Sequence, residues 1–215
     1  MPFSKLEAFK AANHFRPKVS LQIGRGKYVI KTAETPEELY ESLKLRHDIF
    51  YRELLGIETV HGLDIDHFDA DCDHLLIIDS SIKKIVGSYR IICSKFHDTF
   101  YSSQEFDIHR LVQRPGVKVE LGRACIHPDF RSGSVITLLW RGVAAYMQAV
   151  DAHVFFGCAS IKTEDPRESA MLYRYFLNEG RFHEDLLCPP LPSFEMPGFE
   201  AAAASFQRSL TSEET

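Results

Sequence analysis

Apolar and polar positions along the chain follow patterns typical of a mixed α/β protein. Short apolar or alternating runs predict strands, and apolar positions that recur every three or four residues predict helices. Strands are expected at Tyr28–Thr32, His74–Asp79, Ile85–Cys93, Val117–Ile126 and His153–Ser160. Helices are expected from Thr35 to about Leu55, near Ile108–Gln113, at Val135–Ala149 and at Pro166–Glu179. This order predicts one mixed sheet with helices on both faces.

Charge divides the chain into an N-terminal arm, a central domain and a tail. Residues 1–35 hold seven Lys or Arg against two Glu, although the whole chain has a net charge of −5. We therefore predict a basic arm over residues 1–27, a single domain over 28–200 and a tail over 201–215 that frays after Phe206. The arm is either solvated or meets an anionic membrane or an acidic protein, and Phe3, Leu6 and Phe9 at helical spacing support the second alternative.

Composition is that of an ordinary soluble protein, with 215 residues, 45% hydrophobic and 26% charged. No apolar run is long enough to cross a bilayer, and charged residues interrupt the first apolar positions, so no signal peptide is expected. The five cysteines form no CxxC pair, which predicts reduced thiols and no metal site. We expect a cytoplasmic protein, with peripheral contact at the inner membrane face as an option, and no nucleic-acid partner.

One stretch, Val119–Gly133, combines a predicted strand with a Pro-containing turn, a short polar loop and a helix start. A loop of this kind leaves backbone N–H groups unpaired at a helix N-terminus, where the dipole favours an anion. Arg131, Ser132, Gly133 and Ser134 would then surround a phosphate, with Ile126 at the end of the strand. The alternative is an ordinary helix cap.

The same stretch resembles the GNAT acyltransferase signature, in which a strand ends in Pro, an aromatic residue and Arg before a glycine loop. The resemblance implies the GNAT fold, with a splayed central strand beside which a pantetheine arm lies. It also implies no permanently bound cofactor, because the phosphopantetheine-linked acyl thioester is the donor substrate. Only Gly133 follows Arg131 in this loop, where two glycines are usual for the pyrophosphate of coenzyme A. A single phosphodiester fits better, which favours acyl carrier protein as the partner.

A wider resemblance covers roughly residues 28–180. The order of Arg46, Phe50, Asp66, Asp69, Arg90, Glu120 and Arg123 is similar to that of acyl-homoserine-lactone synthases. Segments such as Leu45-Arg46-x-x-Ile49-Phe50-Tyr51 and Leu138-Leu139-Trp140-Arg141-Gly142 look more like ornithine–acyl-carrier-protein N-acyltransferases, the lyso-ornithine lipid synthases also labelled hemolysins. The resemblance implies transfer of a 3-hydroxyacyl group to the α-amine of ornithine or a similar amino acid. The alternatives are acyl-homoserine-lactone synthesis and a non-catalytic protein that binds acyl carrier protein.

Amide formation needs a base, because an amino-acid α-amine is mostly protonated at neutral pH. Glu120 is the candidate, provided that burial raises its pKa; alternatively it only pairs with Arg123. Alternation along a strand puts these two side chains on opposite faces, so we predict a β-bulge at Gly122 that brings them together and frees an amide for the thioester oxygen.

The segment Asp64–Asp73 contains five aspartates and lacks the glycine and the glutamate of a calcium-binding EF-hand loop. It is either a solvated loop or part of the acceptor site. In the second case Asp66 and Asp69 hold ammonium groups, and Arg46, Arg90 or Arg123 binds the carboxylate. Phe50 is expected beside this site or in the slot for the acyl chain.

Overall fold

The computed structural model describes residues 15–59 and 61–212, which form two compact units. The first unit contains the described residues up to Phe100 together with Gly116–Gly157. The second contains Tyr101–Pro115 and the described residues from Cys158 onward. The candidate site residues all belong to the first unit, so each unit is described by itself.

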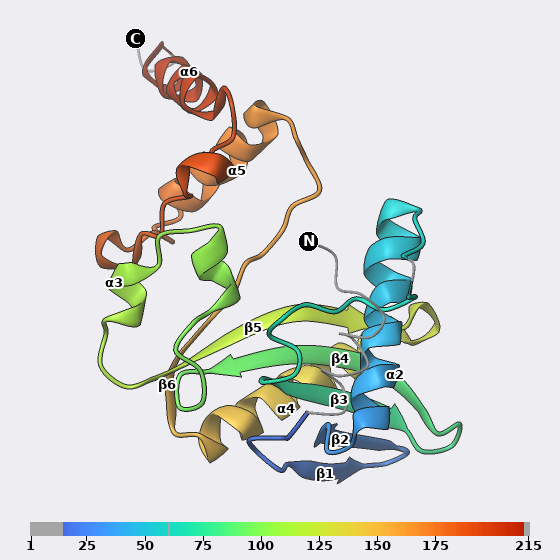
Figure 1. Cartoon of the computed structure of the whole chain (residues 1–215). Helices are drawn as coiled ribbons and strands as arrows, with labels where there is room; N and C mark the ends of the chain where they lie inside the picture. The colour runs from blue at the N-terminus through green and yellow to red at the C-terminus, as the bar shows by residue number, and fades with distance from the viewer. Residues whose placement is uncertain (1–14, 60, 213–215) are drawn as a thin grey trace. The chain divides into compact units, whose positions relative to one another are not determined.

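The first unit is built on one six-stranded sheet with the order β1-β2-β3-β4-β5-β6 (Figure 1). Neighbouring strands are antiparallel except β5 and β6, which are parallel. The expected mixed sheet is therefore confirmed. The strands are β1 (Gln22–Arg25), β2 (Tyr28–Thr32), β3 (Asp73–Asp79), β4 (Lys84–Cys93), β5 (Val117–Ile126) and β6 (Ala152–Phe156).

Two long helices cover this sheet. Helix α2 (Pro36–His47) begins at Thr35, whose hydroxyl accepts a 3.2 Å hydrogen bond from the Glu38 amide. It continues as a π-helix over Asp48–Glu53, and Gly56 follows with φ +68°. Helix α4 (Ser134–Ala149) follows β5 after a short 3-10 helix, Pro128–Phe130.

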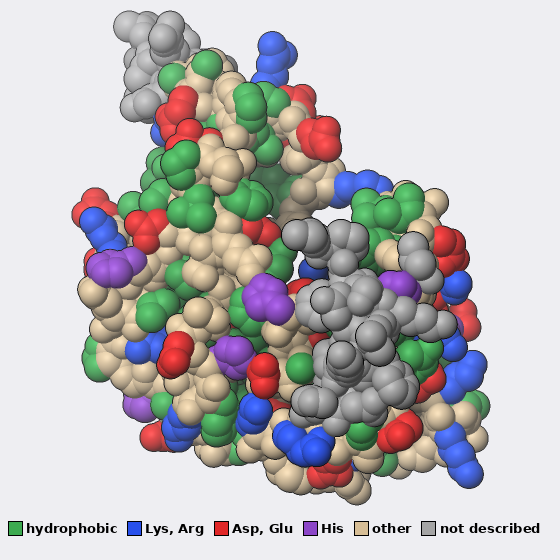
Figure 2. All heavy atoms as spheres, viewed as in Figure 1, with side chains coloured by type: hydrophobic (Ala, Val, Ile, Leu, Met, Phe, Trp, Pro, Cys, Tyr) green, Lys and Arg blue, Asp and Glu red, His purple; other side chains and the backbone are tan. Residues whose placement is uncertain are grey.

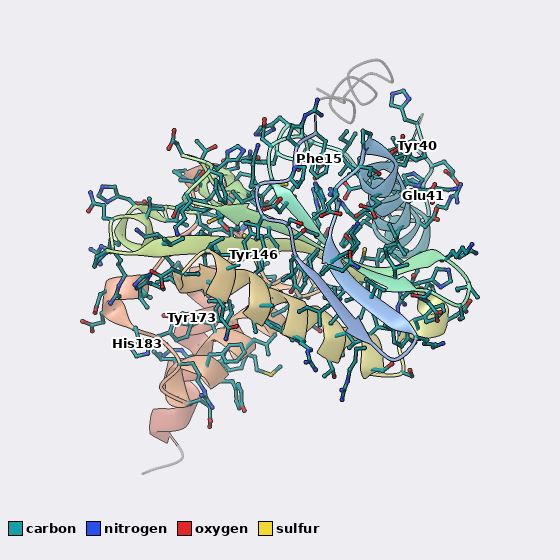
Figure 3. The ribbon with its side chains drawn as sticks, turned by 90° about the horizontal axis from the view of Figure 1, so that it is seen from below. Phe15, Tyr40, Glu41, Tyr146, Tyr173 and His183 are labelled. Carbon is teal, nitrogen blue, oxygen red and sulfur yellow. The ribbon has the colours of Figure 1, made fainter. Side chains whose placement is uncertain are left out.

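The helices lie on opposite faces of the sheet, as alternation along β3 requires. Leu75 packs in the cluster that contains α4 residues, whereas its neighbour Leu76 packs with Leu43 of α2. Two labelled aromatic residues in Figure 3 mark the two faces. Tyr146 of α4 donates a 2.7 Å hydrogen bond to Asp73, and Phe15 makes an edge contact with the next residue, His74.

Part of the predicted N-terminal arm belongs to this unit. Phe15 is only 1% exposed, and β1 pairs antiparallel with β2. Strand β1 was not predicted, because it has only four residues and most of them are exposed. Phe3, Leu6 and Phe9, with their predicted helical spacing, lie outside the described residues.

The second unit is helical, with α3 (His109–Val112), α5 (Pro166–Asn178) and α6 (Phe199–Ser212). Short 3-10 helices lie at Tyr101–Gln104, Glu184–Leu186 and Pro192–Phe194. Tyr173 of α5, labelled in Figure 3, has ring contacts with Phe182 and Phe199. Helix α6 includes most of the predicted tail, and it is anchored where Arg174 donates two hydrogen bonds to the Ala203 carbonyl. The run of alanines at 201–204 explains the helix.

Acidic and basic side chains are interspersed on the face that Figure 2 shows. Within residues 15–59 and 61–212, none of the helices combines the length and hydrophobicity that a membrane span requires.

Candidate active site

Strands β5 and β6 separate in the middle of β5. Their parallel pairing runs from Val117 to Glu120, which is opposite Phe156, the last residue of β6. A Cβ on Gly157 would lie 2.2 Å from the Leu121 carbonyl oxygen, so the chain leaves β5 where only a glycine fits. In the described part of the chain, β5 has no strand partner on this side beyond Glu120. The predicted splayed strand is confirmed.

A β-bulge lies in β5 beside this opening. Ser88 of β4 is opposite Cys125 and Arg90 is opposite Gly122, so Tyr89 alone faces two residues of β5. The extra residue is Arg123, which has φ +53°. The bulge was predicted at Gly122. It lies one residue later, and a non-glycine residue adopts the left-handed conformation.

The open edge of β5 presents backbone amides. His127 donates its N–H to Val86 of β4 over 2.9 Å, and backbone groups alternate in direction along a strand. The N–H groups of Ala124 and Ile126 therefore point away from β4, toward the side that β6 has left. These amides are the groups that a bound pantetheine arm or a thioester oxygen would meet.

The bulge puts Glu120 and Arg123 over the same face of the sheet, the α2 face. Glu120 is 2% exposed and lies opposite Ile92, two residues from Arg90 on the same face. The Arg123 guanidinium lies 5.7 Å from the Phe50 ring centre, and its Nε lies 3.5 Å from a carboxylate oxygen of Asp64. The proposed base and the arginine thus share one site, although their roles stay predictions.

A buried ion-pair network joins the acidic loop to α2. Arg46 is fully buried; its Nε donates to Asp64 over 2.9 Å, and its two terminal nitrogens donate to Asp69 over 2.6 and 3.2 Å. Burial alone would lower the pKa of Arg46, but the charges of Asp69 and Asp64 outweigh it and raise that pKa. Burial would likewise raise the pKa of Asp69, yet the attraction of Arg46 and Arg90 holds it well below its usual value.

Arg90 extends this network toward the surface. It donates to Asp66 over 2.6 Å and to Asp69 over 3.3 Å, and the neighbouring aspartates raise its pKa despite its burial. The Asp66 side chain is 24% exposed and that of Arg123 is 30% exposed, and the two lie 3.9 Å apart. These are the charged groups of the network that solvent reaches.

The residues predicted to bind the acceptor differ in how far they are exposed to solvent. Asp66, Arg123 and the half-buried Phe50 lie where a substrate can contact them. Arg46 and Asp69 are fully buried and bound to each other, so direct contact between either of them and an acceptor is not favoured. The geometry gives both a positioning role, because together they fasten the acidic loop to α2. Arg90, 2% exposed, connects the two groups.

The predicted phosphate loop is exposed and begins α4. Gly133 has φ +94° at the N-cap, and no side chain caps the helix there. Arg131 donates through Nε to the Ile126 carbonyl over 3.1 Å, which directs its guanidinium along the end of β5. Its terminal nitrogens form a bidentate pair with Glu53 at 2.6 and 2.7 Å. Ser132 and Ser134 are also exposed.

A further buried cluster adjoins the acidic loop. Ligand-type atoms of Asp69, Cys72 and His74 all lie within 4.8 Å of one another, a spacing that a metal ion could use. Asp69 is already bound by two guanidinium groups, and burial raises the pKa of the Cys72 thiol, which keeps it protonated. These features favour a structural cluster. No motif in the sequence predicts this cluster, because its residues lie in an irregular loop and at the start of β3.

Asp64 and Glu53 are the site residues that sequence reasoning missed. Asp64 bonds Arg46 directly, but in the sequence it is one of five aspartates with nothing to single it out. Glu53 pairs with Arg131, which lies 78 positions away in the sequence, and only the fold brings the two together.

Comparison with known proteins agrees with this architecture. A family model described as Acetyltransferase (GNAT) domain matches residues 45–141, which include the end of α2, the acidic loop, β5 and the first half of α4. The splayed strand, the bulge and the helix-start loop lie within that match. Residues 45–141 thus form a GNAT acetyltransferase domain, and the chain has the GNAT acyltransferase fold.

Within that class the chain is similar to curated enzymes named L-ornithine N(alpha)-acyltransferase. The one from Brucella abortus (strain 2308) is 33% identical over 185 residues, covering 79% of this chain and 66% of the relative. The one from Rhizobium meliloti (strain 1021) is 37% identical over 169 residues, covering 72% and 57%. The chain therefore spans less than two thirds of the length of each of these two relatives.

Solved structures of low sequence identity are also similar. The AHL synthase LasI is 20% identical, with 73% of this chain and 78% of that chain covered and a TM-score of 0.47. An acyl-CoA N-acyltransferase from Pseudomonas aeruginosa is 20% identical, with 71% and 87% covered and a TM-score of 0.43.

Proposed function

We propose that the chain is an N-acyltransferase that moves a fatty acyl group from acyl carrier protein to the α-amine of ornithine or a similar amino acid. The observation that carries this proposal is the opening between β5 and β6 after Glu120, which adjoins both the bulge and the Arg131 loop. The names of the curated relatives support ornithine as the acceptor.

The donor arm is proposed to lie along the open edge of β5. The Ile126 amide, which points to that edge, would bind the pantetheine. The phosphodiester would lie at Arg131 and the α4 N-terminus, with Ser132, Gly133 and Ser134 around it. One phosphodiester carries a single negative charge, which matches a loop with one arginine and one glycine.

The thioester carbonyl would then lie next to the bulge. The Ala124 N–H points to the same edge and is the candidate donor to the oxygen that becomes negative in the tetrahedral transition state. The amine nitrogen forms a bond to the carbonyl carbon, the carbon–sulfur bond breaks, and the thiol of the carrier leaves. Glu120 would accept the proton that the attacking ammonium must lose, directly or through one water.

The acceptor is proposed to bind at the exposed end of the ion-pair network. Arg123 would bind its carboxylate, stacked on Phe50, and Asp66 would bind its side-chain ammonium. Asp66 carries a charge that Arg90 holds in place, so an acceptor with a second cationic group is preferred over a neutral one. Arg46 and Asp69 would keep the loop in position.

An assay of the purified chain tests this function. It is incubated with 3-hydroxyacyl-acyl carrier protein and a panel of amino acids, and amide products are identified by mass spectrometry. We expect acyl-ornithine, and a loss of at least about a hundredfold in turnover for Glu120→Gln. Glu41→Gln, which changes an exposed carboxylate on α2 (Figure 3), is the matched control and should leave turnover unchanged.

The outcomes separate the alternatives. Product from S-adenosylmethionine and not from ornithine would favour acyl-homoserine-lactone synthesis, and donor binding without any product would favour a non-catalytic role. Unchanged turnover of Glu120→Gln would remove this residue from the mechanism.

A further inference from the structure

The Arg131 loop already holds an anion in this structure, the carboxylate of Glu53. Both terminal nitrogens of Arg131 bond to the two oxygens of Glu53, at 2.6 and 2.7 Å. A carboxylate in this bidentate geometry presents two oxygens to the guanidinium much as a phosphodiester does. Glu53 therefore occupies the same face of Arg131 that the donor phosphate requires.

We infer that Glu53 is an internal competitor for the phosphate of the donor, and that donor binding exchanges Glu53 for the phosphodiester on Arg131. The inference rests on the proposed function, since it assumes that Arg131 binds the donor.

The position of the pair makes such an exchange feasible. The two side chains are 42% and 37% exposed, so an incoming phosphate can reach the guanidinium from solvent. Exposed ion pairs are weak because water screens them and long side chains lose freedom on pairing. The pair holds Arg131 in this structure, and it is weak enough for the phosphate, helped by the α4 N-terminus, to displace it.

The Glu53 carboxylate is charged under assay conditions. The hydrogen bond from Arg131 lowers the pKa of Glu53 below its ordinary value. The other bond of Arg131, from Nε to the Ile126 carbonyl, does not involve Glu53. The guanidinium can therefore change its anion while it stays attached to the end of β5.

The π-helix supplies Glu53 at this place. The Leu54 amide bonds to the Ile49 carbonyl five residues earlier, so the helix contains one wide turn. In a regular α-helix, residues seven apart share a face, and Glu53 would lie above the buried Arg46. The wide turn moves Glu53 around the axis, so that it meets Arg131 instead.

Two donors that differ only in the phosphate test the exchange. One is an acyl thioester of phosphopantetheine and the other is the same acyl thioester of pantetheine. Their KM values are measured with the wild type, Glu53→Gln and Glu58→Gln, and binding of unacylated phosphopantetheine and pantetheine is measured by calorimetry. Glu58 lies just after this helical segment and pairs with Arg52. Glu58→Gln therefore removes a neighbouring exposed carboxylate and is the matched control.

We expect Glu53→Gln to lower KM and the dissociation constant about two- to fivefold for the phosphate-bearing compounds only. Glu58→Gln should change neither. A raised or unchanged KM for the phosphate donor, or an equal fall for both donors, would overturn the inference. Phosphate-dependent binding that strengthens in Glu53→Gln without any acyl transfer would uphold the exchange and overturn the proposed reaction. Absence of phosphate-dependent binding in all three proteins would overturn the exchange itself.

Discussion

Replacement of Arg46 by Met tests whether the buried network fastens the acidic loop. Arg46 makes three hydrogen bonds to two carboxylates, and the side chains of those carboxylates are 3% and 0% exposed. Arg46→Met keeps most of the side-chain volume but leaves Asp64 and Asp69 buried with less compensating charge. Asp69 keeps the 3.3 Å contact with Arg90 and the 2.7 Å hydrogen bond from the Asp66 amide.

Removal of one partner from a buried pair costs about 3–5 kcal/mol. With a urea m-value of about 2 kcal/mol per M, the unfolding midpoint should fall by roughly 1.5–2.5 M. The single tryptophan, Trp140, lies on α4 in the first unit, so its fluorescence follows the unfolding of that unit. Arg52→Met, which removes an exposed arginine from the same helical segment, is the control and should have a much smaller effect.

The loss should also depend on pH. In the wild type, the low pKa of Asp69 contributes stability that is present above its unfolded value of about 3.9 and is lost as the pH falls below it. Without Arg46, burial instead raises the pKa of Asp69, so the Asp69 carboxylate of the variant takes up a proton as the pH falls. Protonation removes the cost of its buried charge. The difference between wild type and variant should therefore narrow from pH 7 to pH 5. A difference below about 1 kcal/mol at pH 7, or one that widens on acidification, would refute the reasoning.

Two further substitutions test the sheet. Gly157→Ala would bring a Cβ to 2.2 Å from the Leu121 carbonyl, so we expect a loss of about 1–3 kcal/mol and a lower melting temperature. Gly24→Ala, where a Cβ meets nothing within 4 Å, is the control, and an equal melting temperature for both variants would contradict the close contact. His74 has a pKa of about 6.5 in the unfolded chain, and burial lowers it to about 4 in the folded protein. The contribution of neutral His74 to the free energy of unfolding is therefore fully present above pH 6.5 and falls by about 3 kcal/mol towards pH 4. His74→Gln should flatten this slope in urea titrations between those pH values, and a slope equal to that of the wild type would contradict it.

Local patterns were enough to predict most of the first unit. The bounds of β2 and β5 agree with the expected runs, and α2 begins where Thr35 and Pro36 predicted a helix start. These elements obey short-range rules, because apolar spacing and capping residues are properties of neighbouring positions. Helix α6 was not predicted, because residues near the end of a chain were expected to fray.

The candidate site was predicted only in part, for a physical reason. Identities such as Glu120 and Arg123 were visible in the sequence, but burial depends on contacts between distant segments. The fully buried position of Arg46 follows from its pairing with Asp69, 23 positions away, and no local rule predicts such a partner. The bulge is a similar case, because Gly122 has the conformational freedom but the register with β4 puts the extra residue at Arg123.

The wide turn at Asp48–Glu53 takes up one residue more than a regular α-helix needs. If the turn became regular at the same length, Glu53 would rotate by about 100° about the axis, away from the Arg131 guanidinium. If one residue of the turn were deleted, α-helical bonding would return while Glu53 kept nearly its present direction, because the extra residue is what the wide turn absorbs. Among relatives, a one-residue gap in this segment is therefore compatible with the same glutamate–arginine contact in a regular helix.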